Sequence, residues 1–230
     1  MREIIFDTET TGLDPRSGDR LVEIGCIEMI NRVPTGAVFH AYFCPERSMP
    51  AEAEAVHGLS ESFLADKPKF RERVSELMEF IGDAPLVAHN ANFDFNFLDA
   101  ELAQCGLEPV CRSRMIDTVA IAKRRHPGAK LSLDALCSRY GIDRSHRTKH
   151  GALLDAELLA QLYVELTGGR QIGLELAAEA EAARLENEVQ IVSLVTRRTW
   201  RAPRPHVASE AELARHAAFL ASMKEPIWAR

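Results

Sequence analysis

Two acidic residues near the N-terminus are the first side chains whose spacing suggests chemistry. Asp7 and Glu9 follow residues 3–6, which read as a short buried strand. Residues two apart on a strand point to the same face, so the two carboxylates would lie side by side. Like charges that close repel unless a cation lies between them, and hard divalent cations such as Mg²⁺ prefer oxygen ligands. Taken alone, the triplet Asp7-Thr8-Glu9 could also be a solvated strand end without a function.

A second polar group lies between an expected strand and an expected helix. The segment reads His89-Asn90-Ala91-Asn92-Phe93-Asp94. Asn90 or Asn92 could simply cap the helix, and Asp94 could sit in its first turn and favour the helix dipole. Open α/β sheets, however, tend to place their sites at the carboxyl ends of strands. That location favours a functional role for the segment.

A histidine and an acid five residues apart form the third group. Five helical residues turn through about 500°, so His150 and Asp155 would diverge by about 140° if both were helical. Gly151 lets His150 lie on the preceding loop while Asp155 projects from the helix. An imidazole titrates near neutral pH and suits a general base. An ordinary loop histidine and an exposed helical acid are the alternatives.

These three groups need strands and helices to position them. Apolar runs predict strands at 3–6, 21–30, 38–43, 86–88 and 115–116, with turn residues at 31–36 making a hairpin of the second and third. Helical spacing predicts helices at 70–81, 93–105 with Gly106 as its C-cap, 119–125, 132–140 and 152–167. Antiparallel strands followed by alternating helices and strands predict an α/β fold, a mixed sheet with flanking helices.

Composition narrows the class of protein. The chain has 230 residues, 46% hydrophobic and 27% charged, and no run of 18 apolar residues that would span a membrane. Five cysteines without a C-x-x-C pair argue against a zinc site or a disulfide framework and favour the cytoplasm. Residues 1–168 hold 19 basic and 26 acidic side chains, a net charge of −7. That charge disfavours broad electrostatic gripping of nucleic acid, although it suits acids that hold metal ions.

Taken together, the three groups resemble the motifs of the DEDD exonuclease superfamily in its histidine-containing branch. The matching residues are 6–12, 89–94 and 150–156, in that order. More narrowly, the chain resembles the proofreading (epsilon) subunits of bacterial DNA polymerase III, densely to about residue 170 and loosely beyond. Supporting stretches are 56–59, 132–137 and 163–169. The resemblance implies a ribonuclease H-like fold, with an exonuclease domain at 1–169 and a linker and polymerase-binding tail at 170–230.

The resemblance also implies a reaction and the residues that perform it. Hydrolysis of the last phosphodiester at a DNA 3′ end would release a nucleoside 5′-monophosphate. Two divalent cations, Mg²⁺ or Mn²⁺, would be held by four acids: Asp7, Glu9, Asp94 and Asp155. His150 would be the general base that takes the proton of the attacking water.

Substrate contacts are implied in the same way. The residues that would contact the terminal nucleotide are Asp7, Glu9, Glu52, His57 and Asp155. Glu54 lies only two residues from Glu52, so either could be the matching acid. Thr10 and Gly12 would let the backbone approach the nucleotide closely. Asp117 is an acid near an expected strand end that matches no motif, and it is interpreted as structural.

The tail carries the expected protein partners. Residues 171–176, Gln-Ile-Gly-Leu-Glu-Leu, resemble the peptide that docks on the bacterial sliding clamp (beta), with the start of a linker helix as the alternative. A helix is expected at 209–223. Apolar residues typical of partner anchors are Trp200, Pro203, Pro205, Phe219, Ile227 and Trp228. The resemblance implies binding to the polymerase (alpha) subunit, and packing on the chain's own domain is the alternative. It leaves open a small third core subunit.

Two alternative functions share part of this sequence pattern. A 3′–5′ exoribonuclease of the same superfamily would have the same site, but a stand-alone trimming enzyme has no need of a clamp peptide. A non-catalytic scaffold that joins clamp and polymerase would have no reason to keep like charges crowded together. The tail argues against the first, and the acids with His150 argue against the second.

Overall fold

The computed structural model describes residues 1–145, 149–169 and 207–223. The chain divides into two units, the first ending at Leu176 and the second beginning at Ala177. The predicted boundary at 169/170 stays a prediction. The clamp-like peptide at 171–176 and five predicted anchors lie outside the described residues: Trp200, Pro203, Pro205, Ile227 and Trp228.

The first unit is built on one five-stranded sheet with the order β3-β2-β1-β4-β5. Its strands are β1 (Arg2–Thr10), β2 (Leu21–Ile30), β3 (Val33–Tyr42), β4 (Leu86–Ala88) and β5 (Met115–Asp117). The first three pair antiparallel, whereas β4 runs parallel to β1 and β5 parallel to β4. The expected mixed sheet is therefore confirmed.

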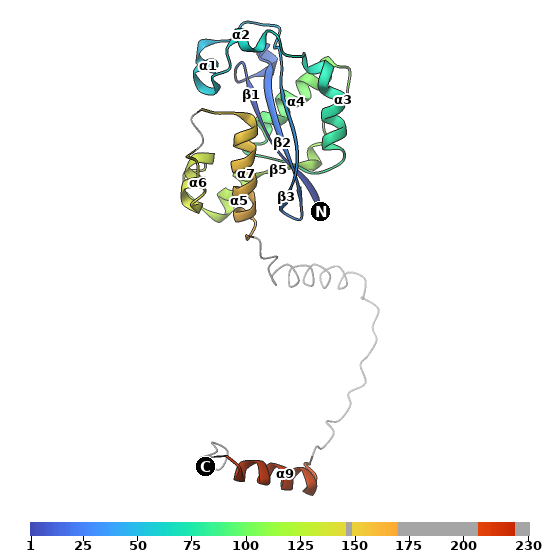
Figure 1. Cartoon of the computed structure of the whole chain (residues 1–230), viewed down its shortest axis with the longest axis vertical. Coiled ribbons are helices and arrows are strands. Elements are labelled where there is room, and N and C mark those ends of the chain that lie inside the picture. The colour runs from blue at the N-terminus through green and yellow to red at the C-terminus, as the bar shows by residue number, and fades with distance from the viewer. Residues whose placement is uncertain (146–148, 170–206, 224–230) are drawn as a thin grey trace, which may run out of the picture. The chain divides into compact units, whose positions relative to one another are not determined.

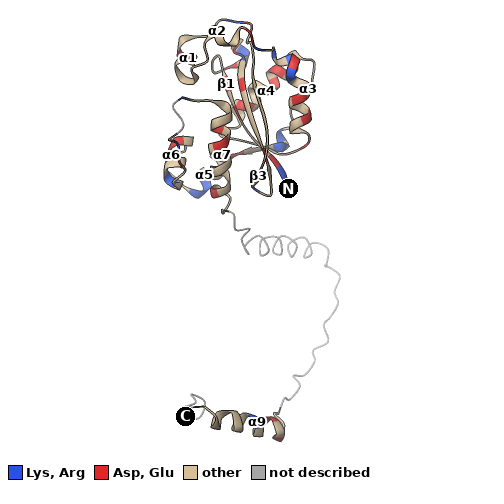
Figure 2. Cartoon of the chain, in the orientation of Figure 1, with Lys and Arg blue, Asp and Glu red and all other residues tan. Residues whose placement is uncertain are grey.

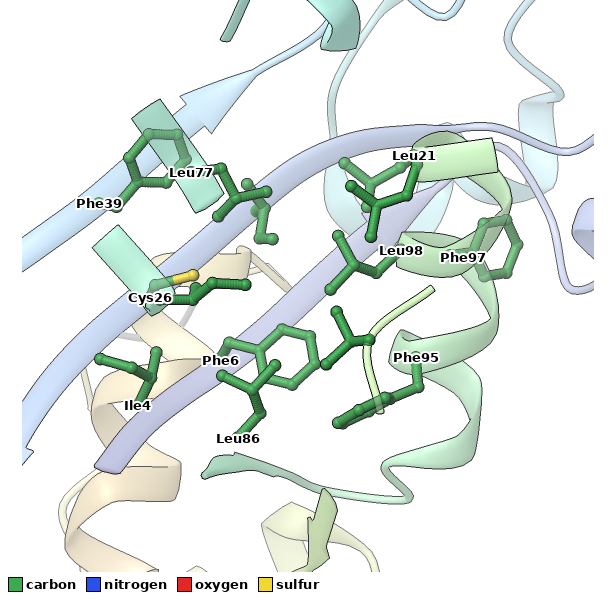
Figure 3. Close-up of a cluster of buried hydrophobic side chains, with 14 of the residues drawn as sticks. Ile4, Phe6, Leu21, Cys26, Phe39, Leu77, Leu86, Phe95, Phe97 and Leu98 are labelled. Carbon is green, nitrogen blue, oxygen red and sulfur yellow. The ribbon is translucent and has the colours of Figure 1, made fainter. Parts of the chain in front are cut away.

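Helices cover both faces of this sheet (Figure 1). The helices are α1 (Ala51–His57), α2 (Glu61–Leu64), α3 (Phe70–Ile81), α4 (Asn92–Gln104), α5 (Thr118–Arg125), α6 (Leu133–Tyr140) and α7 (Ala152–Leu166), with 3-10 turns at Pro15–Ser17 and Arg112–Arg114. One core cluster packs Ile4 and Phe6 of β1 against α3 and α4, through residues such as Leu77 and Phe95 (Figure 3). The other packs Ile5 against α5, α6 and α7. Alternate residues of β1 therefore face different helical layers.

Two strands, β1 and β3, extend several residues further than expected, and β5 extends by one. β1 does not end before Asp7 but continues to Thr10, because Asp7 pairs with Gly25 and Glu9 with Glu23 of β2. β3 begins at Val33 because the hairpin turn consists of two residues, Asn31 and Arg32, with φ of 51° and 65°. Positive φ at both central residues is the hairpin geometry that matches strand twist. The predicted turn at 31–36 was therefore too long.

The helix predictions differ from the structure mainly at the ends. α3 has the predicted bounds, whereas α4 begins at Asn92 and its C-cap is Cys105, not Gly106. α1 and α2 were not predicted. In the second unit, α9 (Glu210–Ala221) confirms the expected helix, and Ser209 and Glu212 form its capping box. Within the described residues, no helix has the length and hydropathy needed to span a bilayer.

Candidate active site

Strand β1 carries two of the predicted acids on one face. Asp7 and Glu9 share that face with Ile5, whose side chain belongs to the α7 layer. Acidic residues also lie on α4 and α7, beside this strand (Figure 2). Both acids line a single cavity, as expected for side chains on one face of a strand.

Helix α7 reaches the strand by a close backbone approach. A Cβ atom on Gly25 would lie 2.4 Å from Cα of Leu153, in the first turn of α7. Only glycine permits the helix to begin that near the sheet. Gly25 pairs with Asp7, so the approach brings the first turn of α7 over the acidic face of β1. Asp155 lies in the same turn and is 3% exposed.

Asp94 reaches the cavity from the first turn of α4. Its side chain is 2% exposed, and the Thr8 hydroxyl donates a 2.8 Å hydrogen bond to Oδ1. Burial raises the pKa of Asp94 to about 7, and the charge of Asp117 adds to this effect. Thr8 was not singled out from the sequence. The two-residue period of a strand could have identified it. Thr8 lies between the two acids, so it points to the opposite face of the strand, toward α4.

His150 lies on the loop before α7, as Gly151 suggested. Its Nδ1 is 3.2 Å from Oδ2 of Asp155, and its side chain is 48% exposed. The backbone N–H of His150 donates to the carbonyl of Val56, which ties the loop to α1. An imidazole oriented through Nδ1 can exchange a proton through Nε2. The geometry thus has an exposed imidazole oriented by a buried carboxyl group.

One cavity of about 270 Å³ gathers these side chains. It is lined by Asp7, Glu9, Asp94, His150 and Asp155, together with Thr8, His89, Asn90, Phe93, Ser132 and Leu133. Glu9, His150 and Asp155 each offer a ligand atom, and these atoms lie within 4.8 Å of one another. Four carboxylates that converge in one cavity suit a hard divalent cation, which would relieve their mutual repulsion. The donor set therefore fits the metal implied by the sequence motifs.

A second cavity of about 360 Å³ adjoins the first and shares Thr8, Glu9 and Phe93 with it. Its remaining lining comes from 10–13 and from α1 with the residue before it: Pro50, Glu52, Ala53, Val56 and His57. The structure therefore brings Glu52 and His57 next to the acids. Glu54 is absent from the lining, which favours Glu52 as the matching residue. Nucleosides suit cavities with apolar walls and a few polar groups.

His57 is nearly buried at the end of α1, with 5% exposure. The backbone N–H of Leu59 donates to its Nδ1 over 3.0 Å, so the neutral ring carries its proton on Nε2. Burial lowers the pKa of His57, which keeps the ring neutral at pH 7. The side chain therefore lines the cavity without bringing a charge.

Gly12 lines the second cavity, and its backbone approach to the nucleotide stays a prediction. A Cβ atom there would lie 2.2 Å from the Asp19 carboxylate, so glycine is also needed to make room for Asp19. Asp19 is paired with Arg47 over 2.7 Å. The Thr10 hydroxyl donates to the Gly12 carbonyl over 2.6 Å. These contacts shape the loop that forms one wall of the second cavity.

Asp117 acts as a structural brace, in agreement with its interpretation from the sequence. Its Oδ1 accepts hydrogen bonds from Val119 N, which caps α5, and from Asn90 N over 3.1 Å. Asn90 has a φ of 64° on the loop before α4. The N-cap of α4 is Ala91, with no side-chain cap bond, so neither asparagine caps that helix.

Comparison with known proteins gives a consistent picture. The sequence profile of the exonuclease family, RNase_T, matches residues 4–163. DNA polymerase III subunit epsilon of Rickettsia felis is 46% identical over 226 residues, 97% of this chain and 97% of the relative. The subunit epsilon of Escherichia coli K12 is 42% identical over 226 residues, 95% and 92% of the two chains. A solved structure of exonuclease X in complex with 5′ overhanging duplex DNA is 27% identical, with a TM-score of 0.55, and the match covers 71% of this chain and 90% of that one.

Proposed function

This chain belongs to the exonuclease family and, within it, to the epsilon subunits of DNA polymerase III, and from that membership we propose its reaction and partners. The protein is a 3′–5′ proofreading exonuclease that shortens DNA from its 3′ end and releases nucleoside 5′-monophosphates. The observation that carries the proposal is one cavity that holds four carboxylates and a histidine, beside a second cavity of nucleoside size.

Membership of this family implies dependence on a divalent metal ion. Two ions, Mg²⁺ or Mn²⁺, would be held by the carboxylates of Asp7, Glu9, Asp94 and Asp155, whose convergence supports this assignment. When bound, such ions supply positive charge that stabilises the negative phosphate oxygens during displacement. Crowded carboxylates repel one another, which gives the site its affinity for cations.

His150 acts as the general base in this proposal. Its Nε2 accepts a proton from the attacking water, whose oxygen bonds to phosphorus while the bond to the 3′ oxygen of the preceding nucleotide breaks. Asp155 lies 3.2 Å from Nδ1 and holds the ring in orientation. The loop position of His150 leaves it exposed to the water that it must reach.

The second cavity receives the terminal nucleotide in this proposal. Its walls include Glu52, His57 and Phe93. Neutral His57 adds no charge to this wall, and Glu52 offers an acceptor for a sugar hydroxyl. A paired end must unpair before it enters so confined a space, and mismatched ends unpair at lower cost. Selectivity for mismatches would follow from that difference.

The partners proposed for the chain are the polymerase alpha subunit and the sliding clamp, and a small third core subunit stays an open question. Among the described residues, α9 supports a docking role, because Leu213 and Phe219 are 57% and 59% exposed on a capped helix. Exposed apolar anchors suit a partner surface. The clamp would bind the peptide at 171–176.

Truncation separates the partner functions from catalysis. A chain that ends at Gly168 is expected to hydrolyse free single strands but to lose polymerase and clamp binding. Gln171→Ala with Leu174→Ala should weaken clamp binding alone, and truncation before Trp200 should remove polymerase binding alone. Equal binding by the Gly168 chain and the full chain would refute the tail assignment.

A paired assay tests the reaction and its main alternative. The full chain is given matched DNA and RNA oligonucleotides with Mg²⁺, and shortening from the 3′ end is followed. Faster cleavage of DNA supports the proofreading assignment, whereas a strong preference for RNA would favour an exoribonuclease. Asp155→Ala should be inactive on both, and turnover near the wild-type value would refute the site.

A further inference from the structure

Lys149 lies in an unusual position across a glycine at the end of α1. Gly58 has a φ of 77° and caps the helix. A Cβ atom on Gly58 would lie 2.6 Å from Cδ of Lys149 and 2.7 Å from its Nζ. The lysine side chain therefore runs over the bare Cα of Gly58, and any larger residue there would displace it. The ammonium group of Lys149 therefore lies against the C-terminal end of α1.

The ammonium group lies near residues of both cavities, although Lys149 itself lines neither. His150 follows Lys149 directly and lines the acidic cavity, while its backbone N–H bonds to Val56. Val56 and His57, which precede Gly58, line the second cavity. Burial is the main cause of the lowered pKa of His57, and the positive charge of Lys149 contributes to it. The ammonium is thus close enough to act on groups in the nucleotide cavity.

The charge of Lys149 is not neutralised within the described residues. Lys69, by contrast, forms an ion pair with Glu46. Lys149 is exposed, and no described carboxylate pairs with it. Residues 1–168 carry a net charge of −7, so the body of the protein repels an anionic strand. A cation beside the acids would offset that repulsion where the phosphate must enter.

We propose that Lys149 binds the phosphate of the terminal nucleotide, in the substrate and in the nucleoside 5′-monophosphate product. The proposal rests on the proposed exonuclease function and adds a residue that neither holds metal nor transfers a proton. Lysine acts on phosphate as a compact point charge. Alternatively, Lys149 could stabilise α1 by interacting with the carbonyls at its C-terminus. In that case, replacing Lys149 would lower the stability of the protein and leave phosphate binding unchanged.

The test uses the full chain and three lysine variants. Lys149→Met keeps an aliphatic stem over Gly58 and removes the charge, and Lys149→Arg restores a charge. Lys123→Met is the matched control, because Lys123 is exposed on α5 and no residue of α5 lines either cavity. Each variant is assayed for hydrolysis of a single-stranded oligonucleotide across a salt series, for binding of thymidine 5′-monophosphate with Mg²⁺ present, and for Tm.

Lys149→Met should lower kcat/KM about tenfold at low salt, the loss of one charge-assisted hydrogen bond. The slope of log(kcat/KM) against log salt should become shallower by about 0.7, the value for one phosphate contact on a single strand. Affinity for thymidine 5′-monophosphate should fall about tenfold as well. Lys149→Arg should recover most of both, and the control should match the wild type.

Two outcomes overturn the assignment of Lys149. The first is that Lys149→Met hydrolyses the oligonucleotide and binds the monophosphate as the wild type does. The second is that these two values are unchanged but the Tm is lower, which would mean that Lys149 only stabilises α1. If the wild type fails to hydrolyse DNA at all, the proposed function is wrong, and the binding of thymidine 5′-monophosphate still decides whether Lys149 holds a phosphate.

Discussion

Replacing Asp94 by asparagine should stabilise the metal-free protein at neutral pH while it abolishes hydrolysis. The side chain is 2% exposed, and burial raises its pKa from 3.8 to about 7. A carboxyl with a higher pKa in the folded state binds its proton more tightly there, so the free energy of unfolding falls as pH rises from about 4 to about 7. That difference in pKa corresponds to about 4 kcal/mol at pH 8.

Asparagine removes this charge and keeps the local contact. Its Oδ1 can still accept the hydrogen bond that the Thr8 hydroxyl donates to Asp94 over 2.8 Å. We expect Asp94→Asn to gain about 2–4 kcal/mol in free energy of unfolding at pH 8 with EDTA present. The gain should shrink by about 2–3 kcal/mol at pH 5, where the wild-type carboxyl is largely protonated.

Urea denaturation of both proteins at pH 5 and pH 8, in EDTA, measures this directly. Asp66→Asn is the control, because Asp66 is exposed and should show no such gain. Added Mg²⁺ should raise the Tm of the wild type more than that of Asp94→Asn. Equal stability of the two proteins at pH 8, or a gain that does not change with pH, would refute the argument that Asp94 is a buried, destabilising charge.

Three further substitutions probe the scaffold and the base. Gly25→Ala should cost about 1–3 kcal/mol of stability, measured by urea denaturation, and lower kcat, because its Cβ would overlap the backbone at Leu153. Glu101→Gln should cost about 3 kcal/mol in the same assay, because Glu101 is buried and bonds Arg20 at 2.7 and 2.8 Å. His150→Ala should lower kcat about 10²–10⁴-fold while metal binding, followed by calorimetry, persists. Wild-type values in any of these measurements would contradict the corresponding assignment.

Local periodicity explains which parts of the site were predictable. The two-residue repeat of a strand placed Asp7 and Glu9 on one face, and the structure has them in one cavity. Gly151 marked the start of α7, so the loop position of His150 followed from local sequence. Likewise, apolar spacing gave α3 its bounds because its buried residues recur every three or four positions. These features need only neighbouring residues to be read.

Features that depend on distant residues were not predictable. α1 has seven residues, begins after Pro50 without a side-chain cap bond and buries only His57, so it has no apolar stripe to detect. The reason for Gly25 lies in α7, more than a hundred residues away. Gly12 likewise makes room for Asp19, which loop composition does not reveal.

Cleavage of a 5′-labelled primer annealed to a template tests the central claim most directly. With Mg²⁺ present, the full chain should shorten the primer one nucleotide at a time from its 3′ end, release nucleoside 5′-monophosphates, and act faster on a mismatched end than on a paired one. Asp7→Ala should leave the primer intact under the same conditions. Loss of nucleotides from the 5′ end, internal cuts, or equal activity in Asp7→Ala would contradict the account.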